Sequence, residues 1–145
     1  MKQEKDTQEN KILCGHGNLL IYTKEEQPQY LKLIDIQLKS IGFKYLLFNQ
    51  NDKKIEEYLD KVSDCFSKYC SKTLIVQLSE TKDNIINLIY RIKEFEGKTQ
   101  RKMTKILFRW DKVENDKFNH HFDYIFRLPI IYPDIQTIIK SLESE

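Results

Sequence analysis

The sequence predicts a doubly wound α/β domain: a three-layer sandwich whose five-stranded parallel sheet, in the order 2-1-3-4-5, carries helices on both faces. Short apolar runs, of the length of buried strands, alternate with longer stretches in which apolar residues recur at helical spacing. Strands that are apolar along their length are typical of parallel sheets covered on both faces. Right-handed crossovers then leave few topologies, of which this order suits five strands best.

The five strands are expected where the apolar runs lie. The third run, TLIVQL, indicates a strand most clearly because it is rich in β-branched residues. No internal repeat or low-complexity linker interrupts the series. The runs cover residues 19–22, 45–48, 73–78, 105–110 and 122–127.

Amphipathic segments predict four helices between and after these strands. Gly42 is expected to cap the first helix, and Gly97 to stop the third. The polar residues 111–121 show little helical periodicity, so a loop is expected in place of a fourth crossover helix. From the first to the last apolar residue of each, the predicted helices cover 30–41, 55–69, 85–95 and 133–142.

Length and composition predict one domain. A chain of 145 residues can bury a single core, with residues 1–11 as a charged N-terminal tail and residues 12–145 as the domain. No apolar stretch is long enough to span a bilayer, and the N-terminus resembles neither a signal peptide nor a transit peptide, so a cytoplasmic location is expected. Three cysteines, an odd number, fit reduced thiols. A net charge of +2 favours neither nucleic acid nor acidic lipid as a partner.

The order of elements over residues 19–143 resembles the receiver domain of response regulators. The most specific part is DYIFRLPIIYPDIQTIIKSL, which is similar to the last strand, the Lys-Pro turn and the last helix of that family. The resemblance implies chemistry at the carboxyl ends of the strands. An acidic pair there would bind Mg²⁺, an Asp after the third strand would accept a phosphoryl group, and a Ser or Thr and a Lys would end the fourth and fifth strands.

The sequence departs from this pattern at each position. Mg²⁺ needs converging oxygen ligands, and a serine hydroxyl does not replace an acyl-phosphate acceptor. The nearest carboxylates, Glu25, Glu26 and Glu80, come late. Phosphorelay chemistry is therefore not expected, and neither is enzymatic activity. The departures are Thr23 and Lys24 after the first strand, Gln77 to Ser79 after the third, Arg109 and Trp110 at the end of the fourth, and Leu128 before Pro129, with Arg127 one residue earlier.

No cofactor, metal or nucleic-acid site is expected either. The turn after the first strand contains no glycine with which the backbone could approach a phosphate. Cys65 and Cys70 are expected on different faces of one helix. Cys14, His16 and the two adjacent histidines at 120 and 121 lack the paired spacing of zinc ligands. The basic run 98–102 lacks the interleaved aromatic residues of single-strand binders.

The segment between Trp110 and Phe126 is the strongest candidate for a functional surface. It combines aromatic residues and two histidines around a polar loop at the carboxyl end of the strands, and such aromatics anchor protein interfaces. The alternative is that they fill the core beneath the missing helix. The candidate partner-binding residues are Arg109, Trp110, Phe118, His120, His121 and Phe122.

Three functions remain open. The favoured one is a non-catalytic pseudo-receiver that binds protein partners as a subunit or docking domain of a larger assembly. The second is an active phosphoacceptor receiver that uses a displaced carboxylate, and the third is a flavodoxin-like enzyme or flavin binder. A flat, closed surface at the strand ends would favour the first, clustered acidic side chains the second, and a large apolar pocket the third.

Overall fold

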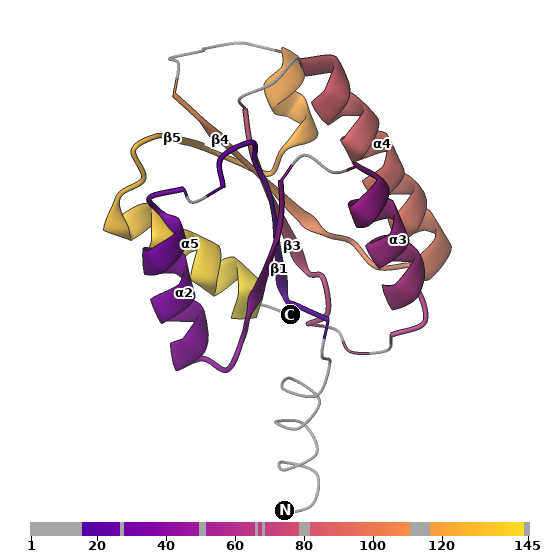
Figure 1. The fold of residues 1–145 in the computed structure, drawn as a ribbon, viewed down its shortest axis with the longest axis horizontal. Helices are drawn as coiled ribbons and strands as arrows, with labels where there is room; N and C mark the ends of the chain where they lie inside the picture. The colour runs from indigo at the N-terminus through magenta and orange to yellow at the C-terminus, as the bar shows by residue number, and fades with distance from the viewer. Residues whose placement is uncertain are drawn as a thin grey trace, which may run out of the picture.

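The computed structural model describes the chain as a three-layer α/β sandwich (Figure 1). The tail predicted at residues 1–11 lies outside the described residues, as do residues 12–15. Of the described helices, none is long and apolar enough to cross a membrane. The described residues are 16–26, 28–49, 52–65, 67, 69–78, 82–110 and 117–143.

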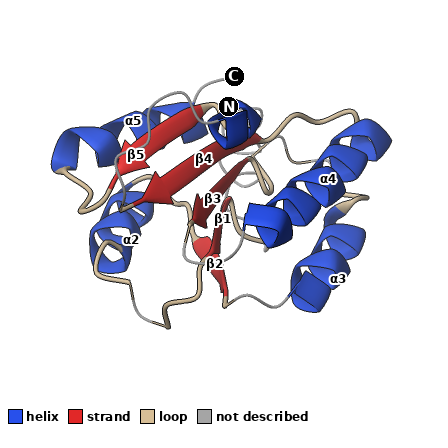
Figure 2. Cartoon of the chain, turned by 90° about the horizontal axis from the view of Figure 1, so that it is seen from above, coloured by secondary structure: helices blue, strands red, loops and turns tan. Residues whose placement is uncertain are grey.

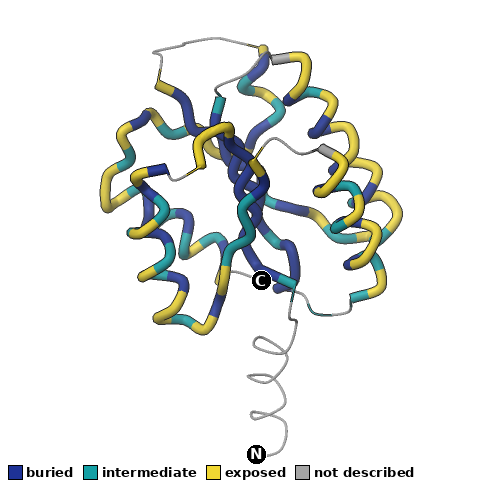
Figure 3. Tube along the Cα trace, in the orientation of Figure 1, coloured by how far each residue is buried: buried dark blue, intermediate teal, exposed yellow. Residues whose placement is uncertain are grey.

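A five-stranded sheet forms the middle layer, and its order β2-β1-β3-β4-β5 confirms the predicted topology (Figure 2). Every neighbouring pair of strands is parallel. In the two central strands, β1 and β3, every residue is buried, as Figure 3 shows by their dark blue trace. The strands are β1 (Leu19–Tyr22), β2 (Tyr45–Phe48), β3 (Thr73–Gln77), β4 (Thr104–Arg109) and β5 (Tyr124–Arg127).

Four α-helices form the outer layers. Helices α2 and α5 cover one face of the sheet, and α3 and α4 cover the other (Figures 1 and 2). Because side chains alternate along each strand, Leu20 and Leu74 pack towards α3 and α4, whereas Ile21 and Ile75 pack towards α2 and α5. The helices are α2 (Leu31–Ser40), α3 (Asp52–Val62), α4 (Lys82–Thr99) and α5 (Tyr132–Glu143).

Two predicted helix ends were wrong. Helix α3 ends at Val62, seven residues before the predicted end at Tyr69. Tyr69 lies against Phe43 beneath the opposite face of the sheet, with ring centroids 5.4 Å apart, so its apolar character reflects tertiary packing. Helix α4 continues through Gly97 to Thr99, and the left-handed conformation follows at Gln100, where φ is 61°. An exposed glycine costs a helix only about 1 kcal/mol and need not end it.

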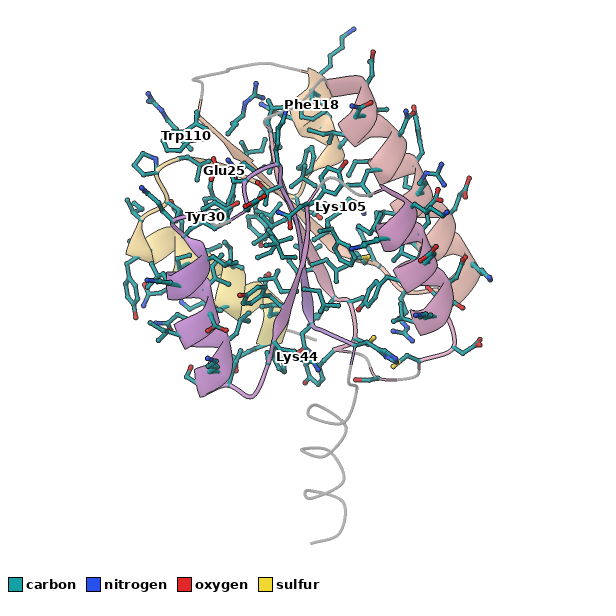
Figure 4. All side chains as sticks on the ribbon, viewed as in Figure 1. Glu25, Tyr30, Lys44, Lys105, Trp110 and Phe118 are labelled. Atoms are coloured by element: carbon teal, nitrogen blue, oxygen red, sulfur yellow. The ribbon has the colours of Figure 1, made fainter. Side chains whose placement is uncertain are left out.

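The crossover between β4 and β5 contains a 3₁₀-helix, η1 (Lys117–His121), in its described part. Residues 111–116 lie outside the described residues. Phe118 and Phe122 are buried in the core on the α4 side, with ring centroids 5.5 Å apart. Figure 4 labels Phe118. The 3₁₀-helix and the residue that follows it therefore place two aromatic rings against part of the sheet that a crossover helix would cover.

A buried ion pair joins α4 to β4. The Lys105 ammonium lies 2.9 Å from Glu96 Oε1, and Glu96 Oε2 accepts a 2.8 Å hydrogen bond from the backbone N–H of Met103. Lys105 is thus a buried residue and does not extend the basic surface of residues 98–102. Removing one partner of such a pair leaves an uncompensated buried charge.

We predict that Glu96→Ala lowers the free energy of unfolding by about 3 kcal/mol, because it leaves the buried Lys105 ammonium without its carboxylate. Glu94→Ala is the matched control, since Glu94 is an exposed carboxylate on the same helix. Urea denaturation measures both. Equal losses in the two variants would contradict the structural role of the ion pair.

Candidate functional site

A functional site is expected at the carboxyl ends of β1 and β3. The strand order reverses between these two strands, and ligands of open α/β sheets bind in the crevice outside such a point. The side chains that meet there come from the ends of β1 and β3 and from the start of α2. Thr23 and Gln77 belong to the stretches in which the receiver resemblance implies carboxylates; Ser79, in the same stretch as Gln77, lies outside the described residues.

A hydrogen-bonded network fills this position. Thr23 Oγ1 donates to Gln77 Oε1 at 3.1 Å, and the Tyr30 hydroxyl donates to the same oxygen. Gln77 Nε2 in turn donates to Glu25 Oε1 at 2.9 Å, while the backbone N–H of Glu25 donates to Thr23 Oγ1. Thr23, Tyr30 and Gln77 are buried, and Glu25 is exposed at the rim. We call these four residues the strand-end network; Figure 4 labels Glu25 and Tyr30.

The network is neutral apart from Glu25. Burial raises the pKa of the Tyr30 hydroxyl well above its ordinary value; the Thr23 hydrogen bond lowers that pKa, and the Glu25 charge raises it. Tyr30 therefore stays protonated, and donates, across the physiological pH range. Among the described residues, the one group of three or more His, Cys, Asp or Glu side chains that could share a metal ion lies at the opposite end of the sheet. Glu26 is exposed, and Glu80 lies outside the described residues.

A cavity of about 280 Å³ lies beside the network. Its walls come from the start of α2, from Trp110 and from the turn between β5 and α5, which the Leu128 N–H anchors to the Arg109 carbonyl at 2.8 Å. This volume is just below the range typical of pockets for drug-sized ligands, about 300–1,000 Å³. The cavity is lined by Glu25, Gln29, Tyr30, Leu33, Trp110, Leu128, Pro129 and Ile130.

The structure divides the six predicted partner-binding residues. Arg109, Phe118 and Phe122 are buried, so their assignment to a partner surface needs correction. The Arg109 guanidinium lies inside the fold because its Nη1 donates to Asn119 Oδ1 of η1 at 2.8 Å. The two phenylalanines fill the core beneath the shortened crossover, which is the alternative that the sequence left open.

The other three predicted residues remain accessible. Trp110 is 54% exposed, His120 is exposed and His121 is partly buried. Burial lowers the pKa of the His121 imidazole, and the positive charges of Lys93 and His120 lower it further. His121 therefore favours its neutral form, and its ring packs edge-on against Phe118.

A set of exposed apolar side chains lies towards the edge-strand end of the sheet, and of its members only Trp110 is among the six candidate residues named from the sequence. Seven large apolar residues of the described chain are exposed; two of them lie in β5, one directly follows β4, and two lie where the chain enters α5. A signal was present in the sequence: an edge strand whose crossover helix is missing has little to cover it. We call this set the β5 patch; it consists of Trp110, Tyr124, Ile125, Ile131 and Tyr132.

Comparison with known proteins bears on the fold. No protein-family model and no curated protein matches the sequence. Among solved structures, the chain is similar to a crystal structure of a Burkholderia pseudomallei protein described as pilus assembly-related. The TM-score is 0.58 at 11% sequence identity, and the match covers 88% of this chain and 90% of that chain. At this identity the similarity supports the α/β fold and carries no correspondence between individual residues.

Proposed function

We propose that this chain is a non-catalytic, receiver-like interaction module that serves as a subunit or docking domain of a protein assembly. The strand-end network is the observation that carries the proposal. Thr23 and Gln77, which belong to the stretches in which the receiver resemblance implies carboxylates, are buried and uncharged, and hydrogen bonds join them to each other and to the buried Tyr30.

The chemistry of the network argues against phosphoryl transfer. Mg²⁺ is held by several oxygen ligands, usually carboxylates together with phosphate. Here the Gln77 amide directs its NH₂ group at the Glu25 carboxylate, and the amide oxygen already accepts two hydrogen bonds. A carboxamide is also no nucleophile for phosphate, because its nitrogen lone pair is delocalised into the carbonyl group. Glu25 alone offers too few ligands to replace the acidic pair.

The β5 patch is the surface that we assign to a protein partner. Parallel strand β5 pairs with β4 on one side and forms the edge of the sheet on the other. Edge strands with exposed apolar residues are unfavourable in an isolated protein and are usually covered. Tryptophan and tyrosine are the side chains that most often anchor protein interfaces. The description of the structural neighbour as pilus assembly-related is compatible with a role in an assembly.

The cavity beside the network is the observation that favours a second function, small-ligand binding. Its apolar wall and the half-exposed Trp110 ring suit a flat ligand, but its volume is small for a flavin. A titration with riboflavin or flavin mononucleotide, followed by the fluorescence of Trp110, distinguishes the two functions. Quenching of this fluorescence at micromolar ligand concentrations would favour small-ligand binding.

The first prediction of this proposal concerns phosphorylation chemistry. Beryllofluoride with Mg²⁺ mimics an acyl phosphate, and we expect it to leave the amide NMR spectrum unchanged because the network offers no acceptor carboxylate. Localised, saturable shifts at Thr23 to Glu26 and at Gln77 would instead establish an active receiver. Mg²⁺ alone is the control for non-specific ion effects.

The second prediction concerns the interface. Trp110→Ala should weaken binding to the native partner by about 2 kcal/mol or more, because it removes an aromatic anchor. Stability should change by less than about 1 kcal/mol, because the ring is half exposed. Tyr90→Ala is the matched control: Tyr90 is also 54% exposed, but lies on α4 at the other face of the sheet.

The measurement has two parts. Partners that co-purify with the full chain from its native source are identified, and their affinities for both variants are then determined by calorimetry. Equal effects of Trp110→Ala and Tyr90→Ala on affinity would remove the β5 patch from the interface. A loss of roughly 3–5 kcal/mol in stability for Trp110→Ala would show that the ring is a core residue instead.

A further inference from the structure

Three soft-metal ligands meet at the amino end of the sheet, opposite the strand-end network. His16 precedes β1, and Cys65 and Cys70 lie in the segment between α3 and β3. One ligand atom from each of the three lies within 4.8 Å of the others, and Cys70 Sγ is 3.8 Å from His16 Nδ1. The prediction that both cysteines share one helix and point to different faces was therefore wrong, because α3 ends at Val62.

We propose that His16, Cys65 and Cys70 bind a zinc ion. In a tetrahedral zinc site with Zn–S of about 2.3 Å and Zn–N of about 2.1 Å, a sulfur and a nitrogen lie about 3.6 Å apart, and two sulfurs about 3.8 Å apart. The separation of 3.8 Å between Cys70 Sγ and His16 Nδ1 is close to the ideal value, and the other two separations, which are at most 4.8 Å, need to shorten by no more than about 1.2 Å. Two thiolates and an imidazole select zinc over magnesium or calcium, which prefer oxygen ligands.

The backbone that carries His16 is held in place. Gly17 has a φ of +88°, and a Cβ at this residue would lie 2.8 Å from Cγ of Leu46, so glycine is required there. The His16 carbonyl accepts a hydrogen bond from the Tyr58 hydroxyl at 3.2 Å. The backbone conformation between His16 and the start of β1 is therefore fixed.

The segment that carries Cys70 is equally constrained. Ser71 has a φ of +50°, in the left-handed region that non-glycine residues rarely adopt, and its N–H donates to the Gly17 carbonyl at 3.0 Å. Arg101 Nη1 donates to the Ser67 carbonyl at 3.2 Å and lies 3.5 Å from that of Cys70. Such backbone strain persists where surrounding contacts impose it, and it is concentrated at functional sites. Hydrogen bonds from Tyr58, Ser71 and Arg101 thus fix the backbone around His16 and Cys70.

Coordination would release the two thiol protons, since thiolate is the form that binds zinc. Three ligands from the described residues leave a fourth position for water or for a further side chain. The competing chemistry is a disulfide between Cys65 and Cys70, which are thiols in the structure and close enough to be oxidised after a small movement. The experiment must separate these two outcomes.

The test uses the full chain, reduced and freed of metal with a chelator, and Co²⁺ as a spectroscopic probe. We expect about one equivalent of Co²⁺ to produce the visible bands of tetrahedral cobalt and a near-ultraviolet thiolate charge-transfer band. Zn²⁺ should displace the cobalt and raise the thermal unfolding midpoint of the protein. Cys65→Ser should weaken zinc binding about 100-fold or more, because it removes a direct ligand from a partly exposed position that tolerates the change.

His120→Gln is the matched control, since His120 is an exposed imidazole remote from the site, and it should bind Co²⁺ like the unmodified protein. Absence of the charge-transfer band in the reduced protein would overturn the proposal. So would a band that Cys65→Ser leaves unchanged, or one that only Cys14→Ser removes. Formation of a Cys65–Cys70 disulfide in a protein that takes up no metal when reduced would assign the pair to redox chemistry instead.

Discussion

The burial of Gln77 at the end of the central strand β3 constrains the architecture of the candidate site. A buried carboxamide must have its donors and acceptors satisfied, because each unpaired group costs about 1–3 kcal/mol. Thr23 supplies one partner from the end of β1, and Tyr30 supplies another from the start of α2. The ring of Tyr30 then packs edge-on against Phe108 of β4, with centroids 4.9 Å apart. One amide therefore joins two strands and a helix, and its contacts fill the space between the ends of β1 and β3.

The other end of the sheet follows the same physical rule. Asn18, directly before β1, is buried; its Nδ2 donates to the Tyr69 carbonyl at 3.0 Å, and its Oδ1 accepts from the Lys44 N–H at 3.0 Å. This side chain ties the start of β1 to the chain segments that enter β2 and β3. The ordered backbone that results is the support for the proposed zinc ligands. The exposed apolar side chains lie elsewhere: two of the seven, Tyr124 and Ile125, belong to the edge strand β5.

Local sequence pattern was sufficient for the five strands, and general rules of crossover handedness then gave their order. The runs that form β1, β3 and β4 are buried because these strands lie in the interior of the sheet, and burial of this kind leaves a direct mark on composition. The end of α3 and the continuation of α4 through Gly97 depend on packing between distant segments, which local periodicity does not report. Arg109 illustrates the same limit, because its burial depends on an acceptor ten residues away in η1. The proximity of His16 to Cys70 depends on a loop that the helical pattern concealed.

Exchanging the Gln77 amide and the Glu25 carboxylate tests most directly whether buried, uncharged side chains close the strand ends. Gln77→Glu places a buried carboxylate next to Glu25, and we expect it to cost roughly 2–4 kcal/mol of unfolding free energy at pH 7. That loss should shrink as the pH falls towards about 4.3, since burial raises the folded-state pKa of the new carboxyl above its unfolded value. The double variant Gln77→Glu/Glu25→Gln restores the hydrogen-bonded pair in reverse and should recover most of the stability. Unchanged stability in Gln77→Glu, or its recovery by millimolar Mg²⁺, would contradict a closed site and indicate one that accepts a cation.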